Sequence, residues 1–286
     1  MTLPRFAIHR PATLAEAGEL MNRLGDDAVV YAGGTELLLV MKLGFADYRH
    51  LVDVKGIAEL SRLEIDEDDL LIGGGVTHRT IERSPVVRER WPALAEMTAR
   101  VANVRVRGAG TLGGNLAFAD PHSDPSTFLL AAGASVETWS PSGTRTLAME
   151  DFVLSAYQTA LAPGELIAAV RVPPLTAGSG VAHLKIAFHE RPAATVTCIV
   201  LVADGVVDRA RVAVGSVGLA PARLAAVEEA LVAGAPADEL ERLAREGCEP
   251  IEDANGSVEY KRHLAGVLVR RAADRALSRA ASSAGG

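Results

Sequence analysis

The chain has 286 residues, of which 49% are hydrophobic and 23% charged, and its formal net charge is −7. This composition is that of an ordinary soluble globular protein of one large or two medium-sized domains, with no apolar run near the ~18 residues that a membrane span requires. The acidic balance argues against a nucleic-acid partner, and the lack of a basic segment followed by an apolar stretch at the start predicts a cytoplasmic protein.

The first 175 residues or so alternate short apolar strands with helical segments. The stretch Thr13-Leu-Ala-Glu16 is a capping box, which predicts a helix that Gly25 ends. Apolar runs then predict strands over residues 28–32, 50–54, 70–72 and 166–172, and a hairpin over 136–138 and 145–147. Helices are expected over residues 36–43 and 93–102, with Pro85 and Pro92 each placed like a first helical residue.

Beyond this region the pattern changes to consecutive strands followed by consecutive helices. Residues 175–180 are the best linker candidate. Strands are expected over 181–188, 194–203 and 209–215, with the hairpin signal Asp204-Gly205 between the last two, and helices over 221–232, 237–245 and 260–281. This order indicates an α+β domain with an antiparallel sheet covered on one face. We therefore predict two domains, residues 1–177 and 178–286.

Three glycine clusters end three apolar runs: AVVYAGGTE at 28–36, LLIGGGVTH at 70–78 and GAGTLGGN at 108–115. Glycine allows positive φ and lets backbone amides approach a ligand, so successive amides can surround an anion such as pyrophosphate. Any single cluster is more often a simple turn. The hydroxyls of Thr35 and Thr111 and the amide of Asn115 suit phosphate oxygens, whereas Asp120 and Asp124 can accept hydrogen bonds from ribose or ribityl hydroxyls.

The third cluster contains a formal match to the dinucleotide-binding pattern G-x-G-x-x-G at Gly108, Gly110 and Gly113. The preceding stretch alternates with arginine and is not a buried strand, and Pro121 follows too soon for a helix to run from the glycines. The sequence thus predicts a phosphate-binding loop and not a Rossmann site. Asp124 precedes a proline and a run that ends in glycine, so it fits a helix N-cap and a ligand equally well.

The segments Ala32-Gly-Gly-Thr-Glu36, Thr111-Leu-Gly-Gly-Asn115 and Asp120-Pro-His-Ser-Asp124 together resemble the flavin-binding medium subunit of the molybdenum hydroxylases. That family includes the FAD subunits of bacterial carbon monoxide dehydrogenase and the FAD domain of xanthine dehydrogenase. The resemblance covers nearly the whole chain. It implies an α+β protein in which two small α/β subdomains, about 1–55 and 56–177, form a PCMH/vanillyl-alcohol-oxidase-like FAD-binding domain, and a C-terminal α+β domain closes over the flavin.

The resemblance also implies which residues contact FAD. One loop wraps the pyrophosphate and adenosine side, a second holds the pyrophosphate, one aspartate binds ribityl or ribose hydroxyls, an aliphatic residue packs on the flavin, and a lysine near the ring stabilises the anionic reduced flavin. In that order these are Tyr31, Ala32, Gly33, Gly34, Thr35, Glu36 and Leu37; Thr111, Leu112, Gly113, Gly114 and Asn115; Asp124; Ile167; and Lys185. From the sequence alone, Lys185 would be a snorkelling strand residue.

The function that the resemblance implies is electron transfer. FAD would receive electrons from [2Fe-2S] clusters of a small subunit, which takes them from a molybdopterin site in a large subunit, and would pass them to an external acceptor. The expected assembly is a dimer of heterotrimers. The chain itself offers no catalytic residue, and Cys198 and Cys248 are too far apart for a local zinc or iron–sulfur motif.

Two alternatives stay open at this point: a self-sufficient FAD-dependent oxidoreductase, and a non-catalytic scaffold that has lost its flavin. His78 and His122 adjoin the glycine loops, and a helix-start or turn role is expected for them before a covalent flavin bond. The substrate of the complex is not encoded here. The final acceptor stays open among quinone, oxygen and a nicotinamide nucleotide.

Overall fold

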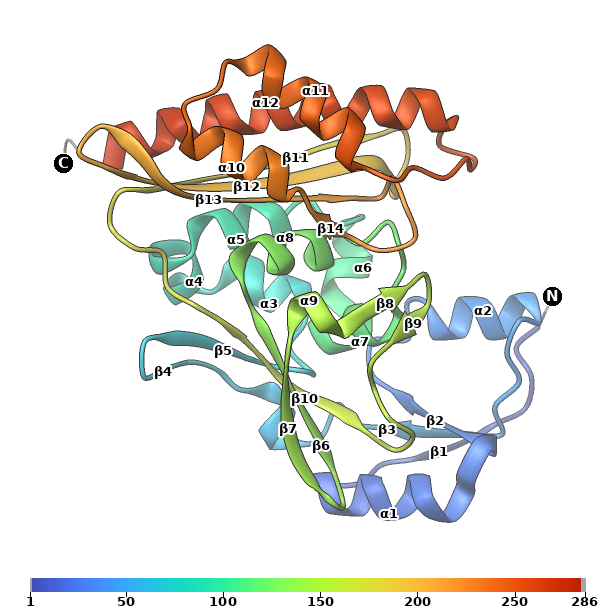
Figure 1. Ribbon diagram of the computed structural model, residues 1–286. Helices are drawn as coiled ribbons and strands as arrows, with labels where there is room; N and C mark the ends of the chain where they lie inside the picture. The colour runs from blue at the N-terminus through green and yellow to red at the C-terminus, as the bar shows by residue number, and fades with distance from the viewer. Residues whose placement is uncertain (1, 284–286) are drawn as a thin grey trace.

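The computed structural model describes residues 2–283. Two sheets and a layer of short helices form the N-terminal part, and an antiparallel sheet below three helices forms the C-terminal part (Figure 1). The fold is therefore α+β, as predicted. Within the described residues, no helix combines the length and apolar character needed to cross a membrane.

The first sheet is small and parallel. Its strands β1 (Ala7–His9), β3 (His50–Asp53) and β2 (Ala28–Tyr31) lie in the order β1-β3-β2. Helix α1 (Leu14–Leu24) packs against β2 and β3, and its predicted capping box forms, because Glu16 N donates to Thr13 Oγ1 and Ala12 N to Glu16 Oε2. Strand β1 was not predicted because its three residues are mostly exposed and form no apolar run. Helix α2 (Leu37–Leu43) follows the first glycine cluster and ends at Gly44, as expected.

The second sheet is antiparallel, with the order β4-β5-β10-β6-β7. Its strands are β4 (Leu63–Asp66), β5 (Asp69–Gly73), β10 (Leu166–Val172), β6 (Ser135–Ser140) and β7 (Gly143–Ala148). The helical layer packs beside it and contains α3 (His78–Arg83), α4 (Pro85–Arg90), α5 (Pro92–Thr98), α6 (Val104–Ala109), α7 (Leu112–Phe118) and α8 (Asp124–Ala132). Short 3-10 turns (Gly25–Asp27, Ala58–Ser61), α9 (Met149–Phe152), β8 (Val153–Ser155) and β9 (Gln158–Thr159) connect these elements.

Two predictions around the third glycine cluster were wrong. A helix does start at these glycines: α7 begins at Leu112, and its N-cap Thr111 accepts a hydrogen bond from Gly114 N at 3.0 Å. Pro121 limits α7 to seven residues and does not prevent it, since Ala119 already ends the helix in a left-handed conformation. Asp124 is not an N-cap either. The cap of α8 is Ser123, whose hydroxyl accepts from Ser126 N, and Asp124 is the first helical residue.

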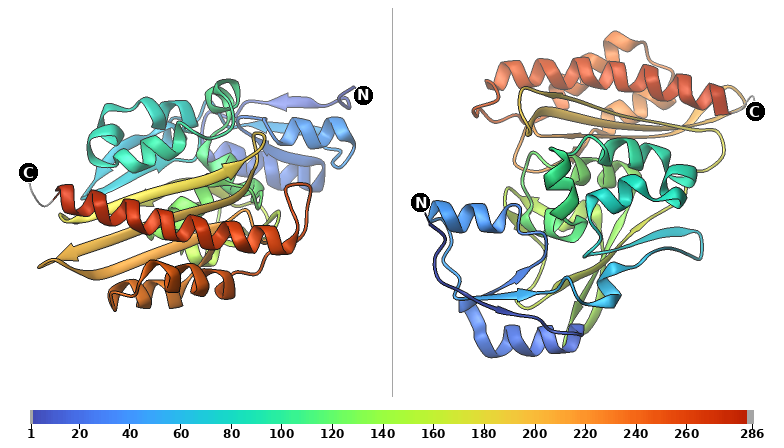
Figure 2. Two further views of the ribbon diagram at one scale, coloured as in Figure 1. Left: turned by 90° about the horizontal axis from the view of Figure 1, so that it is seen from above. Right: turned by 180° about the vertical axis from the view of Figure 1, so that it is seen from behind.

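The C-terminal sheet runs β11-β12-β13-β14 and is antiparallel throughout. Its strands are β11 (Ser179–Ala187), β12 (Pro192–Ala203), β13 (Val206–Gly215) and β14 (Ala222–Arg223), followed by α10 (Ala225–Val232), α11 (Ala237–Gly247) and α12 (Val258–Ser283). Helix α12 lies across β11 and β12, with α10 on β13 (Figure 2). The expected linker overlaps the start of β11. The division of the chain at residues 177/178, and that at 55/56, stay predictions.

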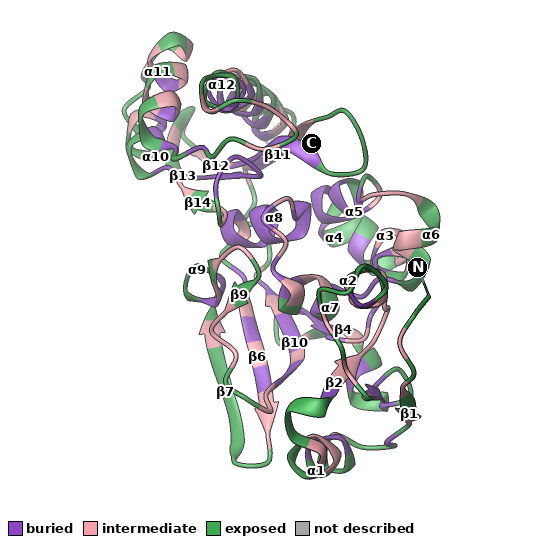
Figure 3. Ribbon diagram, turned by 90° about the vertical axis from the view of Figure 1, so that its right-hand side faces the viewer, coloured by how far each residue is buried: buried purple, intermediate pink, exposed green. Residues whose placement is uncertain are grey.

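Contrary to the one-sided sheet that was expected, both faces of this sheet are covered. Helix α8 packs against β12 and β13 on the face away from α12, and its residues are almost all buried (Figure 3). Strand β12 is accordingly buried from Pro192 to Cys198 without alternation, as a strand enclosed on both sides must be. Helix α8 therefore joins the C-terminal sheet to the helical layer beneath it.

Candidate functional site

A cavity of about 420 Å³ lies where the first sheet, the helical layer and the turn between β11 and β12 meet. This volume is in the range of small-molecule and cofactor sites. Most residues expected to contact a cofactor line it, namely Ala32, Gly33, Gly34, Thr35, Glu36, Leu37, Thr111, Gly113, Gly114, Asn115, Asp124 and Ile167. Tyr31, Leu112 and Lys185 are not in the lining.

The three glycine clusters pack directly against one another at this cavity. A Cβ on Gly33 would lie 2.7 Å from Gly110 Cα, and one on Gly113 would lie 2.8 Å from Gly74 Cα. The clusters are also hydrogen bonded, since Gly113 N donates to Gly74 O at 3.0 Å. Any side chain at these positions would push backbone against backbone. The glycines are therefore needed for the close contact that shapes the cavity, not only for turns.

The first cluster presents free backbone amides to the cavity. Gly33, Gly34, Thr35 and Glu36 donate no backbone hydrogen bond to any residue that the structure describes. The loop is held from behind by Tyr31, whose ring lies against Gly34, and by Lys55, whose ammonium is 3.9 Å from the centre of that ring. Successive unbonded amides beside a cation form a favourable site for an anion. The corresponding amides of the third cluster are different, because those of residues 112–115 already donate within the chain.

Asp124 forms a buried ion pair with Lys185. Lys185 Nζ lies 2.5 Å from Asp124 Oδ2 and also donates to Arg100 O at 2.7 Å, so the ammonium is fully engaged behind the carboxylate. Asp124 is 4% exposed. Its other oxygen, Oδ1, has no hydrogen-bond partner among residues 2–283 and lies 3.5 Å from His183 Nε2. Burial acts to raise the pKa of Asp124, but His183 and Lys185 outweigh it and hold the carboxyl ionised.

His183 was missed by the sequence reasoning. Its Nδ1 is 2.8 Å from Thr197 Oγ1, and Thr197 lies opposite it in the β11–β12 ladder. The period-2 spacing of His183 and Lys185 on one strand puts both side chains on the same face, where they reach Asp124. That spacing is the one signal in the sequence that could have identified the pair.

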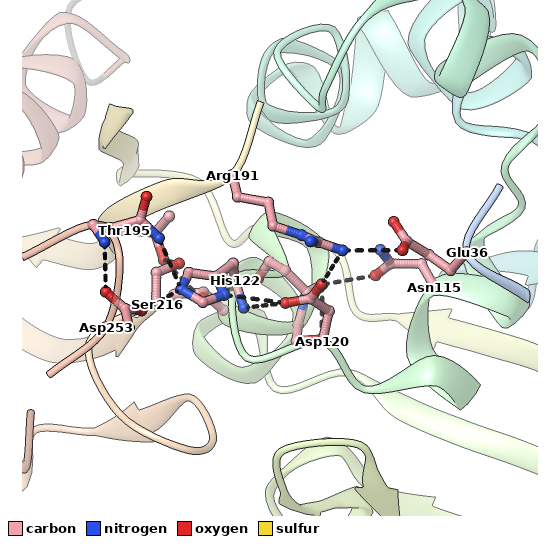
Figure 4. Close-up of polar contacts among 12 residues, drawn as sticks. Glu36, Asn115, Asp120, His122, Arg191, Thr195, Ser216 and Asp253 are labelled. Carbon is pink, nitrogen blue, oxygen red and sulfur yellow. Dashed lines mark hydrogen bonds and ion pairs between the residues drawn. The ribbon is translucent and has the colours of Figure 1, made fainter. Parts of the chain in front are cut away.

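Arg191 was also missed, and it crosses the mouth of the cavity (Figure 4). From the turn between β11 and β12, its guanidinium lies 3.0 Å from Glu36 Oε2 and 2.9 Å from Asp120 Oδ2. Burial raises the pKa of Glu36, and the charge of Arg191 opposes that rise. Nothing local to Arg191 in the sequence predicts these partners, because Glu36 is 155 residues away.

The polar contacts continue from Asp120 to the C-terminal helices (Figure 4). His122 Nδ1 lies 3.2 Å from Asp120 Oδ1, and His122 Nε2 lies 2.9 Å from Asp253 Oδ2. The hydrogen bond with Asp120 raises the pKa of His122, and Asp253 adds to the rise against the effect of burial. Asp253 in turn pairs with Lys261 of α12 at 2.7 Å. We call the series Glu36, Arg191, Asp120, His122 and Asp253 the mouth network.

The two histidines beside the glycine loops occupy the local positions expected of them. His78 is the first residue of α3, and His122 lies in a turn in which its own amide donates to Asp120 Oδ1 at 2.9 Å. Cys198 is buried in β12, where burial raises the pKa of its thiol to about 12. Neither cysteine lines the cavity.

Comparison with known proteins gives two matching family models. The model of the FAD binding domain in molybdopterin dehydrogenase matches residues 4–175, and that of the CO dehydrogenase flavoprotein C-terminal domain matches residues 182–276. The chain is 34% identical to the carbon monoxide dehydrogenase medium chain of Hydrogenophaga pseudoflava, over 98% of this chain and 100% of that one. It is 32% identical to the nicotine 6-hydroxylase medium subunit of Paenarthrobacter nicotinovorans, over 95% and 97%.

Solved structures agree with these matches over the full length. The carbon monoxide dehydrogenase structure from Hydrogenophaga pseudoflava that lacks the Mo-pyranopterin moiety aligns with a TM-score of 0.94 at 34% identity, covering 98% of this chain and 99% of that one. Quinoline 2-oxidoreductase from Pseudomonas putida 86 aligns with a TM-score of 0.93 at 28% identity, with the same coverage. The chain belongs to the family of FAD-binding medium subunits of molybdopterin dehydrogenases, which includes the carbon monoxide dehydrogenase medium chains.

Proposed function

We propose that this chain binds FAD in the cavity and transfers electrons from iron–sulfur clusters of a partner subunit to an external acceptor. The observation that carries the proposal is the row of free amides from Gly33 to Glu36, because it provides donors for an anion where a second glycine loop closes against the first. The pyrophosphate of a dinucleotide has the charge and the oxygens for such a site.

The other cavity residues fit the rest of the cofactor. Asp124 Oδ1 is buried, ionised and without a partner, so it is available to accept a hydrogen bond from a ribityl or ribose hydroxyl. Thr111 Oγ1 accepts from Gly114 N, which leaves its proton free to donate, and Asn115 Nδ2 is free while Asn115 Oδ1 accepts from Ser123. Ile167 supplies an apolar wall. The set matches a polar dinucleotide with one aromatic end.

FAD, once bound, supplies one- and two-electron redox chemistry at its isoalloxazine ring. The chain's own contribution is binding and electrostatics. Lys185 keeps Asp124 ionised in a buried position, and through that carboxylate it places a positive charge behind the cavity wall. Arg191 closes the mouth between Glu36 and Asp120 and restricts the access of water to the cavity. No residue lining the cavity is needed as a nucleophile or general base.

We further propose a large molybdopterin subunit and a small [2Fe-2S] subunit as partners, in a dimer of heterotrimers. Several relatives are named as medium chains or medium subunits, which supports a complex with larger and smaller chains. Residues 2–283 contain no group of three or more His, Cys, Asp or Glu side chains placed to hold a metal ion. This supports metal centres in the partners, from which the electrons would come.

The test is to purify the full chain, add FAD, remove the excess, and record the visible spectrum and the identity of the released cofactor. We expect one FAD per chain for the wild type and a loss of binding for Gly114→Asp and Asn115→Ala. No FAD in the wild type, or unchanged binding in both variants, would refute the assignment. Turnover of a hydroxylase substrate by the flavin-loaded chain alone would instead support a self-sufficient oxidoreductase.

A further inference from the structure

His78 is a buried histidine between two of the glycine clusters. It follows the second cluster as the first residue of α3, and its backbone N donates to Gly110 O of the third cluster at 3.0 Å. The residue is 2% exposed, and it lines the cavity. Its backbone therefore joins two walls of the site, and its side chain belongs to the cavity wall.

The imidazole of His78 lacks the partner that a buried polar group normally has. Its Nδ1 is fully buried and has no hydrogen-bond partner anywhere in residues 2–283. Buried polar groups are nearly always hydrogen bonded, because an unsatisfied one costs about 1–3 kcal/mol. A bound ligand in the cavity would supply the missing partner.

The charge state of His78 restricts what that partner is. Burial, together with the nearby charge of Arg107, lowers the pKa of His78 to about 4, although Asp124 opposes the shift. The ring is therefore neutral at pH 7 and carries one N–H donor and one acceptor nitrogen. A neutral donor is compatible with an oxygen acceptor and does not need a second charged group.

The surroundings of His78 indicate which part of a dinucleotide lies there. A Cβ on Gly110 would be 3.4 Å from His78 Cδ2 and also 3.4 Å from Thr35 Oγ1, so the ring and the hydroxyl flank the same point of the third cluster. Thr35 belongs to the loop whose amides are free. His78 thus faces the junction of the loops, where the anion is expected.

We propose that His78 is a cofactor-binding residue whose Nδ1–H donates to the pyrophosphate of the bound dinucleotide. The proposal rests on the function proposed above. It assigns to the second glycine cluster a role beyond packing, because that cluster and its adjoining helix place the imidazole at the junction. Thr35 and the amides of residues 33–36 provide the other donors.

The experiment compares His78→Leu, His78→Asn and His78→Gln with the wild type, using FAD, ADP and riboflavin as separate probes in binding titrations. ADP contains the pyrophosphate without the flavin, and riboflavin contains the flavin without phosphate. We expect His78→Leu to weaken FAD and ADP by about 10- to 100-fold, the loss of one hydrogen bond to a charged group, and to leave riboflavin unchanged. Asparagine carries an N–H near the Nδ1 position and should retain affinity within about 3-fold, whereas glutamine should not.

Each result bears on the proposal separately. Wild-type affinity for FAD and ADP in His78→Leu would overturn it while leaving the flavin function intact, and equal losses for riboflavin and FAD would place the contact on the flavin and also overturn it. If His78→Leu fails to fold in thermal unfolding, the difference between the asparagine and glutamine variants decides. Absence of FAD binding in the wild type would be a failure of the proposed function itself.

Discussion

Replacing Gly33 by alanine tests whether the contact between the first and third glycine clusters creates the cofactor site. A Cβ there would lie 2.7 Å from Gly110 Cα and closer still to Ala109 O, whereas ordinary van der Waals contact begins at 3.4 Å. Both opposing atoms belong to the backbone, so no side chain can turn away, and the loops must separate by about 0.7 Å. Overpacking of this kind costs about 1–3 kcal/mol, which corresponds to an FAD affinity weaker by about 10- to 100-fold if the loops move apart.

Gly108→Ala is the matched control on the same segment. Gly108 lies in α6 with nothing within 4 Å of an added Cβ. Alanine in a helix is favoured over glycine by about 0.5–1 kcal/mol, so the free energy of unfolding should stay equal or rise. Gly108 is also the first glycine of the formal dinucleotide pattern, so a Rossmann-type site would depend on it. We expect Gly108→Ala to bind FAD like the wild type.

Fluorescence titration with FAD and denaturant unfolding of the unliganded chain measure the two effects separately. The reasoning is refuted if Gly33→Ala binds FAD with wild-type affinity, because the loop contact would then not define the site. It is equally refuted if Gly108→Ala loses as much affinity as Gly33→Ala.

Three further outcomes are expected. Arg191→Ala should change the free energy of unfolding by no more than about 1 kcal/mol, as for other half-exposed pairs, yet release FAD several-fold faster in stopped-flow measurements because the bridge to Asp120 is lost. The pKa of His122 is raised from about 6.5 by its contacts with Asp120 and Asp253, so its stabilising effect is complete below pH ~6.5 and is lost as the pH rises through the raised pKa. Urea unfolding of His122→Gln should lack that decline; an identical pH profile would contradict it. Cys198, with a pKa of about 12, should resist iodoacetamide in the native chain and react after denaturation.

The parts of the site that could be predicted from the sequence are those with local signatures. The clusters at Gly33 and Gly113 were recognisable because close backbone approach requires glycine, whatever the surrounding fold. Helix α7 was missed because the proline rule was applied to a helix that ends before Pro121. A stretch of seven residues fits between the cap and the proline, and no local rule fixes helix length.

The remaining parts depend on contacts between distant segments. Arg191 meets Glu36 only after two domains have packed, and its neighbours in the sequence are apolar residues and a turn. The sheet covered on both faces was missed for a similar reason: α8 reaches it from a different part of the chain. The strand pattern of β12, without alternation, was the available indication.

The bridge at the cavity mouth sets an order on events during synthesis. Glu36 and Arg191 are separated by 155 residues, which a ribosome adding 5–20 residues per second translates in about 8 to 30 s. During that interval the loop with the free amides has been made, but the arginine that crosses its entrance has not. The nascent chain is therefore open to its ligand first and closed afterwards, so cofactor loading during translation does not require the mouth network to open.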